Sequence, residues 1–337
     1  MNRRIFGYSF AAVLTASLLS VSAASAEQKE IRLAKQFSIG SLPLIVMENQ
    51  KLLEKHAKAS GLGDVKVTWQ TFAAGNAMND AILSGSLDFA VAGTPPFLIL
   101  WDKTKGNLDV RAVSALSSIP FYLNTRNRDF KTLDDLKSTD RIALPAVRVS
   151  NQAVMLQMAA AKAYGDANYR KFDELTVSMA PPDASAALLS GSSTINSHFG
   201  IPPLQFLELE NPEIHRVLSS NEVLGGPHSY TVAYATSKFR KENPRTYAAY
   251  IAATKEAVDL INKDKRKAAE IFLNSTSSKL SVDWLHKILQ NPDVRFTLVP
   301  ENTSKMAEFM TRIGTLKNKP ESWKDYFFPE IHAESGS

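Results

Sequence analysis

Apolar residues along this chain form short β-like runs that alternate with stretches of helical periodicity. The first part predicts strands at residues 31–34, 65–71 and 89–92, each followed by a helix, at residues 44–59, 77–83 and 96–103. A second series predicts helices at residues 133–137, 151–164 and 184–189 and strands at residues 141–144 and 175–179. This alternation, with Gly or Pro between elements, is typical of βαβ units. The predicted class is therefore α/β, with mostly parallel sheets flanked by helices.

The two series also resemble each other in their letters. The segment AILSGS at residues 81–86 matches ALLSGS at residues 187–192, and each reads as a helix that ends at Gly. Beyond residue 232 the chain turns helical, with apolar periodicity at residues 244–272, 282–290 and 304–315. No low-complexity linker separates the parts. A compact two-lobed protein is expected.

The first 26 residues have the features of a secretory signal peptide. Arg3 and Arg4 precede an apolar run at residues 5–19, and Ala24-Ser25-Ala26 fits a signal peptidase site. The alternative is an uncleaved anchor, but the run is shorter than the about 20 apolar residues that cross a bilayer. We expect cleavage after Ala26 and a soluble mature protein in a Gram-negative periplasm.

Composition removes several classes of function. The 337 residues include no Cys, which rules out disulfides, thiolate metal sites and cysteine nucleophiles. Without the signal segment the net charge is +3, too small to indicate nucleic-acid binding. No Walker A, His-Glu-x-x-His, Gly-x-Ser-x-Gly or Gly-x-Gly-x-x-Gly motif occurs, and the six His show no ligand spacing. We therefore predict no catalytic residue, metal or cofactor.

Ligands of open α/β sheets bind beyond the carboxyl ends of the strands, where helices begin. The sequence places six such stretches at residues 35–43, 93–96, 118–120, 145–151, 197–203 and 225–230. None contains Asp or Glu, but Lys35 and Arg148 are among them. Such a cleft should prefer an anion or a polar neutral ligand.

The residues of these stretches also have purely structural interpretations. Arg148 could be a solvated residue at a helix start, and Gln36 and Thr94 could cap neighbouring backbone. Phe37 and Phe199 could belong to the core. These alternatives stay open at the level of sequence.

Several motifs together resemble the nitrate, sulfonate and taurine substrate-binding family of ABC importers. They are IRLA at residues 31–34 with LPL at 42–44, LSGSLDFA at 83–90 leading into GTPP at 93–96, and LDDLK at 133–137. In the second lobe they are APPDA at 180–184 and ALLSG at 187–191, and His198-Phe199 before Pro202-Pro203. The likeness extends from about residue 31 to residue 247, and the ordered series is more specific than any single motif.

The resemblance implies a type II periplasmic binding protein fold. Lobe 1 would comprise residues 27–117 and 230–337, and lobe 2 residues 118–229, with the ligand in the cleft between them. Carried onto this sequence, the ligand-binding residues would be Gln36, Phe37, Ser38, Thr94, Ser118, Arg148, Ser150, His198, Phe199 and His228. The partners would be a small organic anion and a membrane ABC permease with its ATPase, and we expect a monomer.

Three functions remain in competition. The favoured one is a solute-binding component of an importer for a sulfonate or carboxylate, with nitrate and pyrimidines as other ligands. The second is a sensory binding protein that reports to a receptor. The third is an enzyme similar to the pyrimidine synthases of thiamine biosynthesis, which share this fold but carry a Cys-rich motif that this chain lacks.

Overall fold

A computed structural model describes residues 27–36, 38–72, 75–191 and 194–337. Its strands are β1 (Glu30–Gln36), β2 (Lys66–Phe72), β3 (Ala90–Ala92), β4 (Val110–Ser118), β5 (Tyr122–Thr125), β6 (Ile142–Leu144), β7 (Thr176–Ser178), β8 (Ser197–Phe199), β9 (His215–Ser219) and β10 (Ser229–Thr236). Its helices are α1 (Leu42–Asn49), α2 (Leu52–Ala59), α3 (Gly75–Leu83), α4 (Thr94–Thr104), α5 (Asn151–Tyr164), α6 (Pro181–Ser190), α7 (Leu204–Glu208), α8 (Ser220–Leu224), α9 (Ser237–Glu242), α10 (Pro244–Lys263), α11 (Lys265–Thr276), α12 (Val282–Gln290) and α13 (Thr303–Arg312). Single 3₁₀ turns lie at Ile39–Ser41, Leu133–Asp135, Asp166–Asn168, Asp173–Leu175, Trp323–Asp325 and Pro329–Ile331.

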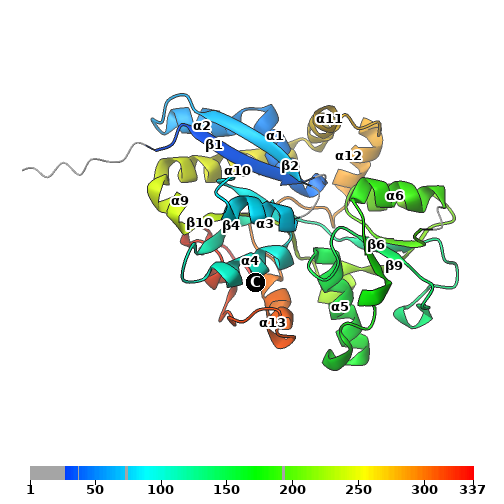
Figure 1. Cartoon of the computed structure of the whole chain (residues 1–337). Coiled ribbons are helices and arrows are strands. Elements are labelled where there is room, and N and C mark those ends of the chain that lie inside the picture. Colours follow the sequence, from blue (N-terminus) through cyan, green and yellow to red (C-terminus); the bar gives the residue numbers. More distant parts are fainter. Residues whose placement is uncertain (1–26, 37, 73–74, 192–193) are drawn as a thin grey trace, which may run out of the picture.

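The strands form two separate layers, one in each half of the molecule (Figure 1). In the first half, β1 pairs with β2 in parallel, and β10 lies between β3 and β4. A parallel bridge between Leu33 and Phe89 joins these two groups of strands. In the second half the strand order is β7-β6-β8-β5-β9. We call the α/β unit on β1–β4 and β10 lobe 1, and the unit on β5–β9 lobe 2.

The sheets of both lobes are mixed and not mostly parallel as predicted, because each contains one antiparallel strand. Strand β10 runs antiparallel to both β3 and β4, and β5 runs antiparallel to both β8 and β9. Both strands directly follow a crossing of the chain from one lobe to the other. A strand that enters a sheet through such a crossing is not bound by the βαβ connection that forces parallel pairing. The predicted lobe limits stay a prediction.

Local signals explain where the helices begin and end. Helix α5 begins after Ser150, whose Oγ accepts a hydrogen bond from the amide of Ala153, and it ends before Gly165. Helix α6 begins at Pro181 and is followed by the C-capping residue Gly191, which has a left-handed φ of 71°. The pattern predicted at residues 244–272 is two helices, because Asp264 ends α10 and caps α11 through the amide of Lys267.

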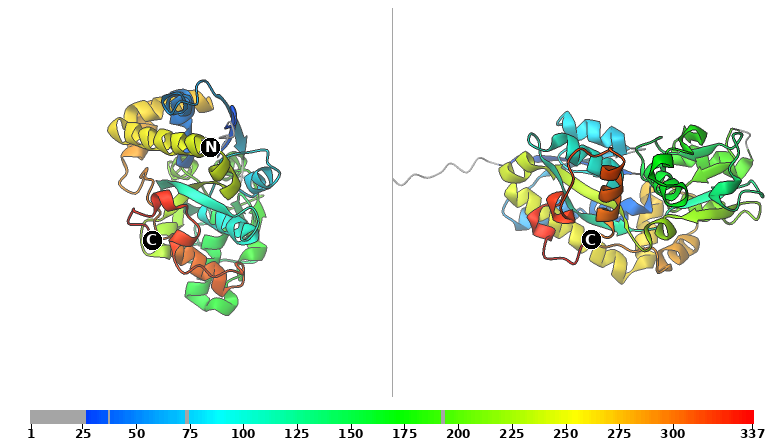
Figure 2. Two further views of the ribbon diagram at one scale, coloured as in Figure 1. Left: turned by 90° about the vertical axis from the view of Figure 1, so that its left-hand side faces the viewer. Right: turned by 90° about the horizontal axis from the view of Figure 1, so that it is seen from below.

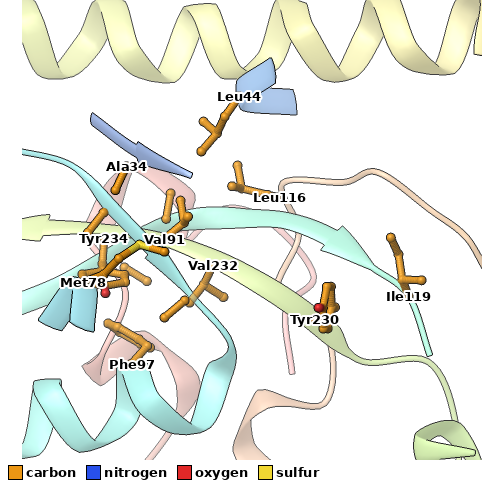
Figure 3. Packing of buried hydrophobic residues seen from close by; sticks show 14 of the residues in the cluster. Ala34, Leu44, Met78, Val91, Phe97, Leu116, Ile119, Tyr230, Val232 and Tyr234 are labelled. Carbon is orange, nitrogen blue, oxygen red and sulfur yellow. The ribbon is translucent and has the colours of Figure 1, made fainter. Parts of the chain in front are cut away.

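The main core covers both faces of the sheet of lobe 1 (Figure 3) and continues into lobe 2. Val91 and Val232 are buried in the sheet, with Leu44 of α1 on one side and Phe97 of α4 on the other. Figure 2 shows that the two lobes lie end to end and make the molecule longer in one direction. Within the described residues, no helix is both long and apolar enough to cross a bilayer. This arrangement leaves the strand ends and helix starts of both lobes facing each other.

Candidate functional site

A pocket that is partly open to solvent lies between the two lobes. Both lobes contribute to its wall. The lining residues are Gln36, Gly75, Gly93, Pro96 and Tyr230 from lobe 1, and Pro145, Ala146, Val149, Ser150, Asn151, Gln152, Pro181 and Ile201 from lobe 2. Residues from both sides of the cleft would therefore contact a bound molecule together.

Helix starts dominate this wall. Gly93 is the N-cap of α4, Ser150 is the N-cap of α5, and Gly75 and Pro181 are the first residues of α3 and α6. Among the described residues, none accepts a hydrogen bond from the backbone N–H of Asn151 or Gln152 in the first turn of α5. Free amides and the positive end of the helix dipole favour an anionic group at such a place.

None of the described lining residues is charged. Lys35 precedes Gln36 in β1, but its ammonium pairs with Glu48 and lies 5.7 Å from the ring centroid of Trp69. An anion in this pocket would therefore be held by amides, hydroxyls and side-chain amides. Uncharged donors of this kind bind anions well when they are fixed in place before the ligand arrives.

Tyr230 lines the pocket and has a buried side chain. Burial raises the pKa of Tyr230 to about 12, so the hydroxyl stays protonated at neutral pH. Its neighbour Ser38 donates to the carbonyl oxygen of Pro202 at 2.9 Å, with the Tyr230 oxygen farther away at 3.4 Å. Because Ser38 has only one hydroxyl proton, which Pro202 accepts, Tyr230 can donate its own proton to Ser38 Oγ.

The lobes touch each other around the pocket. The amide of Ile39 in lobe 1 donates to the carbonyl of Pro202 in lobe 2 at 3.2 Å. In the other direction, Nδ2 of Asn151 donates to the carbonyl of Tyr230 at 3.0 Å. The side chain of Asn151 also packs on Gly93, where a Cβ would lie 1.8 Å from Asn151 Oδ1. The described cleft is thus closed over its pocket by direct contacts between the lobes.

Of the ten residues that the sequence predicted for the site, two line the pocket: Gln36 and Ser150. Two more lie beside it. Ser38 lies against Tyr230, with the two hydroxyl oxygens 3.4 Å apart, and Thr94 begins α4 and donates from its hydroxyl to the carbonyl of Ser229 at 3.0 Å. Phe37 lies outside the described residues.

Arg148 is not brought to the pocket. Its side chain is 65% exposed, and its guanidinium lies 3.5 Å from the carboxylate of Glu174. The residue has a left-handed φ of 67° in the turn before α5, while its neighbour Val149 lines the pocket. This conformation matches the alternative of a solvated residue at a helix start.

His198 and Phe199 are also placed away from the pocket, because they belong to strand β8 and do not follow it. His198 is fully buried, with Nδ1 2.6 Å from the carboxylate of Glu208. Phe199 packs in the core, with its ring centroid 5.4 Å from that of Phe121. The loop after β8 begins later than the sequence suggested, and it is Ile201 that reaches the pocket.

Ser118 and His228 lie where the chain crosses between the lobes, and neither lines the pocket. The hydroxyl of Ser118 accepts from Nη2 of Arg295 at 3.2 Å. His228 is fully buried, with Nε2 2.7 Å from the hydroxyl of Ser220. Burial lowers the pKa of His228 to about 4, so its ring is neutral at physiological pH. Both residues contribute to the structure of the crossings.

The sequence prediction missed Asn151, Gln152, Val149 and Ile201. A usable signal existed for Asn151, since it directly follows a helix-capping Ser in a stretch predicted to face the cleft. No local pattern identifies Gly93 as its contact, because that contact joins residues of different lobes. Within the described part of the chain, no three His, Cys, Asp or Glu residues are grouped as a metal ion would require.

The two α/β lobes with a pocket between them match the periplasmic binding protein fold. Solved structures show the same architecture at low sequence identity. The alkanesulfonate-binding protein SsuA from Xanthomonas axonopodis pv. citri, bound to MOPS, has a TM-score of 0.69 at 18% identity, covering 88% of this chain and 96% of that one. The aliphatic sulphonate binding protein SsuA from Escherichia coli has a TM-score of 0.66 at 18% identity, covering 91% and 100%. The nitrate-binding protein NrtA from Synechocystis PCC 6803 has a TM-score of 0.67 at 13% identity, covering 88% and 84%.

The chain belongs to the NMT1-like family, whose model matches residues 24–273. No curated protein matches it.

Proposed function

We propose that this protein is the periplasmic solute-binding component of an ABC importer for a small organic anion, a sulfonate or a carboxylate. It is exported with cleavage after Ala26, acts as a monomer, and delivers its ligand chemically unchanged to a membrane permease and its ATPase. The observation that carries the proposal is the pocket between the lobes, lined by helix starts from both and by no charged described residue. The sulfonate- and nitrate-binding proteins with this fold support the same class of ligand.

Binding and closure are coupled in this proposal. A ligand that touches Tyr230 in lobe 1 and the first turn of α5 in lobe 2 makes its full set of contacts only when the lobes are closed. It therefore shifts the population toward the closed state by its difference in affinity for the two states. The permease then recognises a shape that reports on occupancy, and no catalytic group is needed.

Titration calorimetry on the exported, ligand-stripped protein tests the proposal. The panel comprises alkanesulfonates, carboxylates, nitrate and a pyrimidine. We expect a sulfonate or a carboxylate to bind with a raised melting temperature and to be recovered unchanged by mass spectrometry. Absence of binding across the panel would refute the proposal, and chemical conversion of the pyrimidine would favour an enzyme in its place.

A further inference from the structure

The chain first crosses from lobe 1 to lobe 2 between β4 and β5, and a buried glutamine of lobe 2 holds this crossing. Gln205 of α7 is fully buried. Its Nε2 donates to the carbonyl of Pro120 at 2.8 Å, and its Oε1 accepts from the backbone amide of Tyr122 at 3.1 Å. A backbone carbonyl only accepts and a backbone amide only donates, so both ends of the side-chain amide are assigned. Gln205 thus pairs with the crossing as a neighbouring strand would.

Ser220, the first residue of α8, holds the residue between these two. Its amide donates to the carbonyl of Phe121 at 3.0 Å, and its hydroxyl accepts from the amide of Phe121 at 3.0 Å. The same hydroxyl lies 2.7 Å from Nε2 of His228, in the second crossing. Because Nδ1 of His228 faces the carbonyl of Ser229 at 3.3 Å, Nδ1 carries the proton and Nε2 accepts from Ser220. Both crossings therefore meet at one buried hydroxyl of lobe 2.

On the other side of Ile119 the chain is bonded to lobe 1. Ser118, the last residue of β4, donates from its amide to the carbonyl of Arg295 at 2.8 Å and accepts from the amide of Arg295 at 3.0 Å. Arg295 belongs to a segment that runs along β4, where the amide of Ala115 donates to the carbonyl of Leu298 at 3.0 Å. In the first crossing the contacts therefore change from lobe 1 to lobe 2 at Ile119.

The second crossing, between α8 and β10, has a similar boundary. The amide of Gly226 donates to the carbonyl of Asn221 in α8 at 2.9 Å, whereas the carbonyl of Pro227 accepts from Nδ2 of Asn302 at 2.6 Å. Asn302 is the N-cap of α13, which packs on α4 of lobe 1. Gly225 and Gly226 have positive φ angles of 73° and 151°, which glycine adopts readily. Here the contacts change from lobe 2 to lobe 1 between Gly226 and Pro227.

We propose that Gln205 and Ser220 are positioning residues for closure, which make residues 120–122 part of lobe 2. Lobe 2 then turns as one body about Ile119 and about the link from Gly226 to Pro227. A hinge of this kind absorbs the change in backbone angles at a few residues while each lobe stays rigid. The inference rests on the closure that the proposed function requires, and it adds the place of the pivots and the residues that confine them.

The same glutamine connects the crossing to the wall of the pocket. The carbonyl of Ile201, a lining residue, accepts from the amide of Gln205 at 3.0 Å. The next carbonyl, that of Pro202, accepts from Ile39 and Ser38 of lobe 1 at 3.2 and 2.9 Å. A change in the crossing therefore moves this part of the wall and its contact with lobe 1 together.

Distances between the lobes test the proposal in ligand-free protein. The chain has no Cys, so Ala59→Cys in α2 and Ala186→Cys in α6 place one spin label on each lobe at an exposed position. In this background Gln205→Met removes both hydrogen bonds of the side-chain amide and keeps the length of the side chain. We expect the distance distribution in pulsed electron double resonance to become at least about 2-fold broader, because bending is no longer confined to the pivots.

The matched control makes the same chemical change elsewhere in lobe 2. Gln157 of α5 is buried and donates from Nε2 to the two carboxylate oxygens of Asp173 at 3.0 and 3.1 Å. Gln157→Met should leave the width of the distance distribution unchanged. Ser220→Ala, which removes only the hydroxyl, should broaden it and decides the question if Gln205→Met does not fold.

An unchanged width in Ser220→Ala and in folded Gln205→Met would overturn the inference. Equal broadening in Gln157→Met would overturn it as well, since the effect would then come from a general loss of stability in lobe 2. The distances are measured without ligand. A negative result here therefore leaves the proposed function standing, and failure of the binding panel leaves the position of the pivots standing.

Discussion

Helices α10 and α5 both begin with backbone amides that can bind an anion, but at α10 the chain itself supplies that anion. At the start of α10, the carboxylate of Glu27 accepts hydrogen bonds from the amides of Arg245 and Thr246 at 3.0 and 2.8 Å, and from Thr246 Oγ1 at 2.8 Å. At the start of α5, Ser150 accepts from Ala153, and the amides of Asn151 and Gln152 have no acceptor among the described residues.

The two helix starts differ in whether the chain itself supplies the anion. Burial alone would raise the pKa of Glu27, but the hydrogen bonds from Thr246 and Arg245 outweigh it, so the pKa lies below its usual value of 4.5. The start of α10 is therefore an anion site that the chain fills with its own carboxylate. The start of α5 has comparable donors and faces the pocket between the lobes, which is where an external anion would take the place that Glu27 occupies at α10.

The largest expected effect comes from obstructing the α5 site. In Gly93→Ala the new Cβ would lie 1.8 Å from Asn151 Oδ1, so the lobes could not close as described. Overpacking of this kind costs about 1–3 kcal/mol, and we expect ligand affinity to fall roughly 10- to 100-fold in calorimetry.

The double variant with Asn151→Ala is the control for this prediction. Removing the side chain that the new Cβ would strike should make the further loss caused by Gly93→Ala much smaller than in the wild-type background. An equal loss in both backgrounds would show that Gly93 acts through something other than this contact.

The next largest effect lies at the filled site. Glu27→Gln removes the charge at the start of α10 and should lower the free energy of unfolding by about 1–2 kcal/mol at pH 7, with ligand affinity unchanged. Glu30→Gln makes the same chemical change three residues on, where the carboxylate is 51% exposed and pairs with Lys66 at the surface. It should change stability by less than about 0.5 kcal/mol.

The pH dependence of this difference has a definite sign. Because the pKa of Glu27 is lower in the folded state, its contribution is complete above the usual value of 4.5 and is lost as the pH falls through the folded value. The gap between wild type and Glu27→Gln in urea unfolding should therefore close on acidification. A gap that widens in acid would contradict the assignment of the carboxylate as the cap.

A smaller effect is expected at Arg148. The sequence alone predicts that Arg148→Ala weakens an anionic ligand markedly, whereas the structure gives its guanidinium an exposed ion pair with Glu174. Since Arg148 does not line the pocket, we expect affinity to change by less than about 3-fold. A loss of ligand affinity of 10-fold or more would show that Arg148 contributes to ligand binding. The anion would then not be held by uncharged donors alone, and the comparison with the start of α10 would not describe the site.

The smallest expected effect is that of pH on binding. Tyr230, with its pKa raised to about 12, is the only titratable group among the described lining residues, and the buried crossing residue His228 has its pKa lowered to about 4. For a sulfonate, affinity should stay constant within about 2-fold between pH 5.5 and pH 8. A steep change in calorimetry across that range would indicate that an ionisable side chain contributes to the site.

The structural features that could be predicted from the sequence are those that adjacent residues determine. Helices α5 and α12 have the predicted bounds, because Ser150 and Ser281 cap them in a way that adjacent residues determine. The α/β class followed from periodicity. Mixed pairing of β5 and β10 was missed because it depends on how the chain re-enters each lobe, which no local pattern records.

The candidate site was predicted less well than the fold, for a physical reason. The stretches that border the cleft could be located from the ends of strands and the starts of helices. Which residue of a stretch faces the pocket changes when the end of the strand moves by a single residue. His198 was expected beyond its strand and lies within it, and Arg148 was expected in the cleft and lies outside it. The fit of Asn151 on Gly93 joins two lobes and has no sequence signature.

A crystal structure of the exported protein with a bound small organic anion tests the central claim most directly. The account predicts the anion between the lobes, with its charged oxygens within hydrogen-bond distance of the amides of Asn151 and Gln152 and with no cationic side chain in contact. An anion held by an arginine or a lysine away from the start of α5 would contradict it.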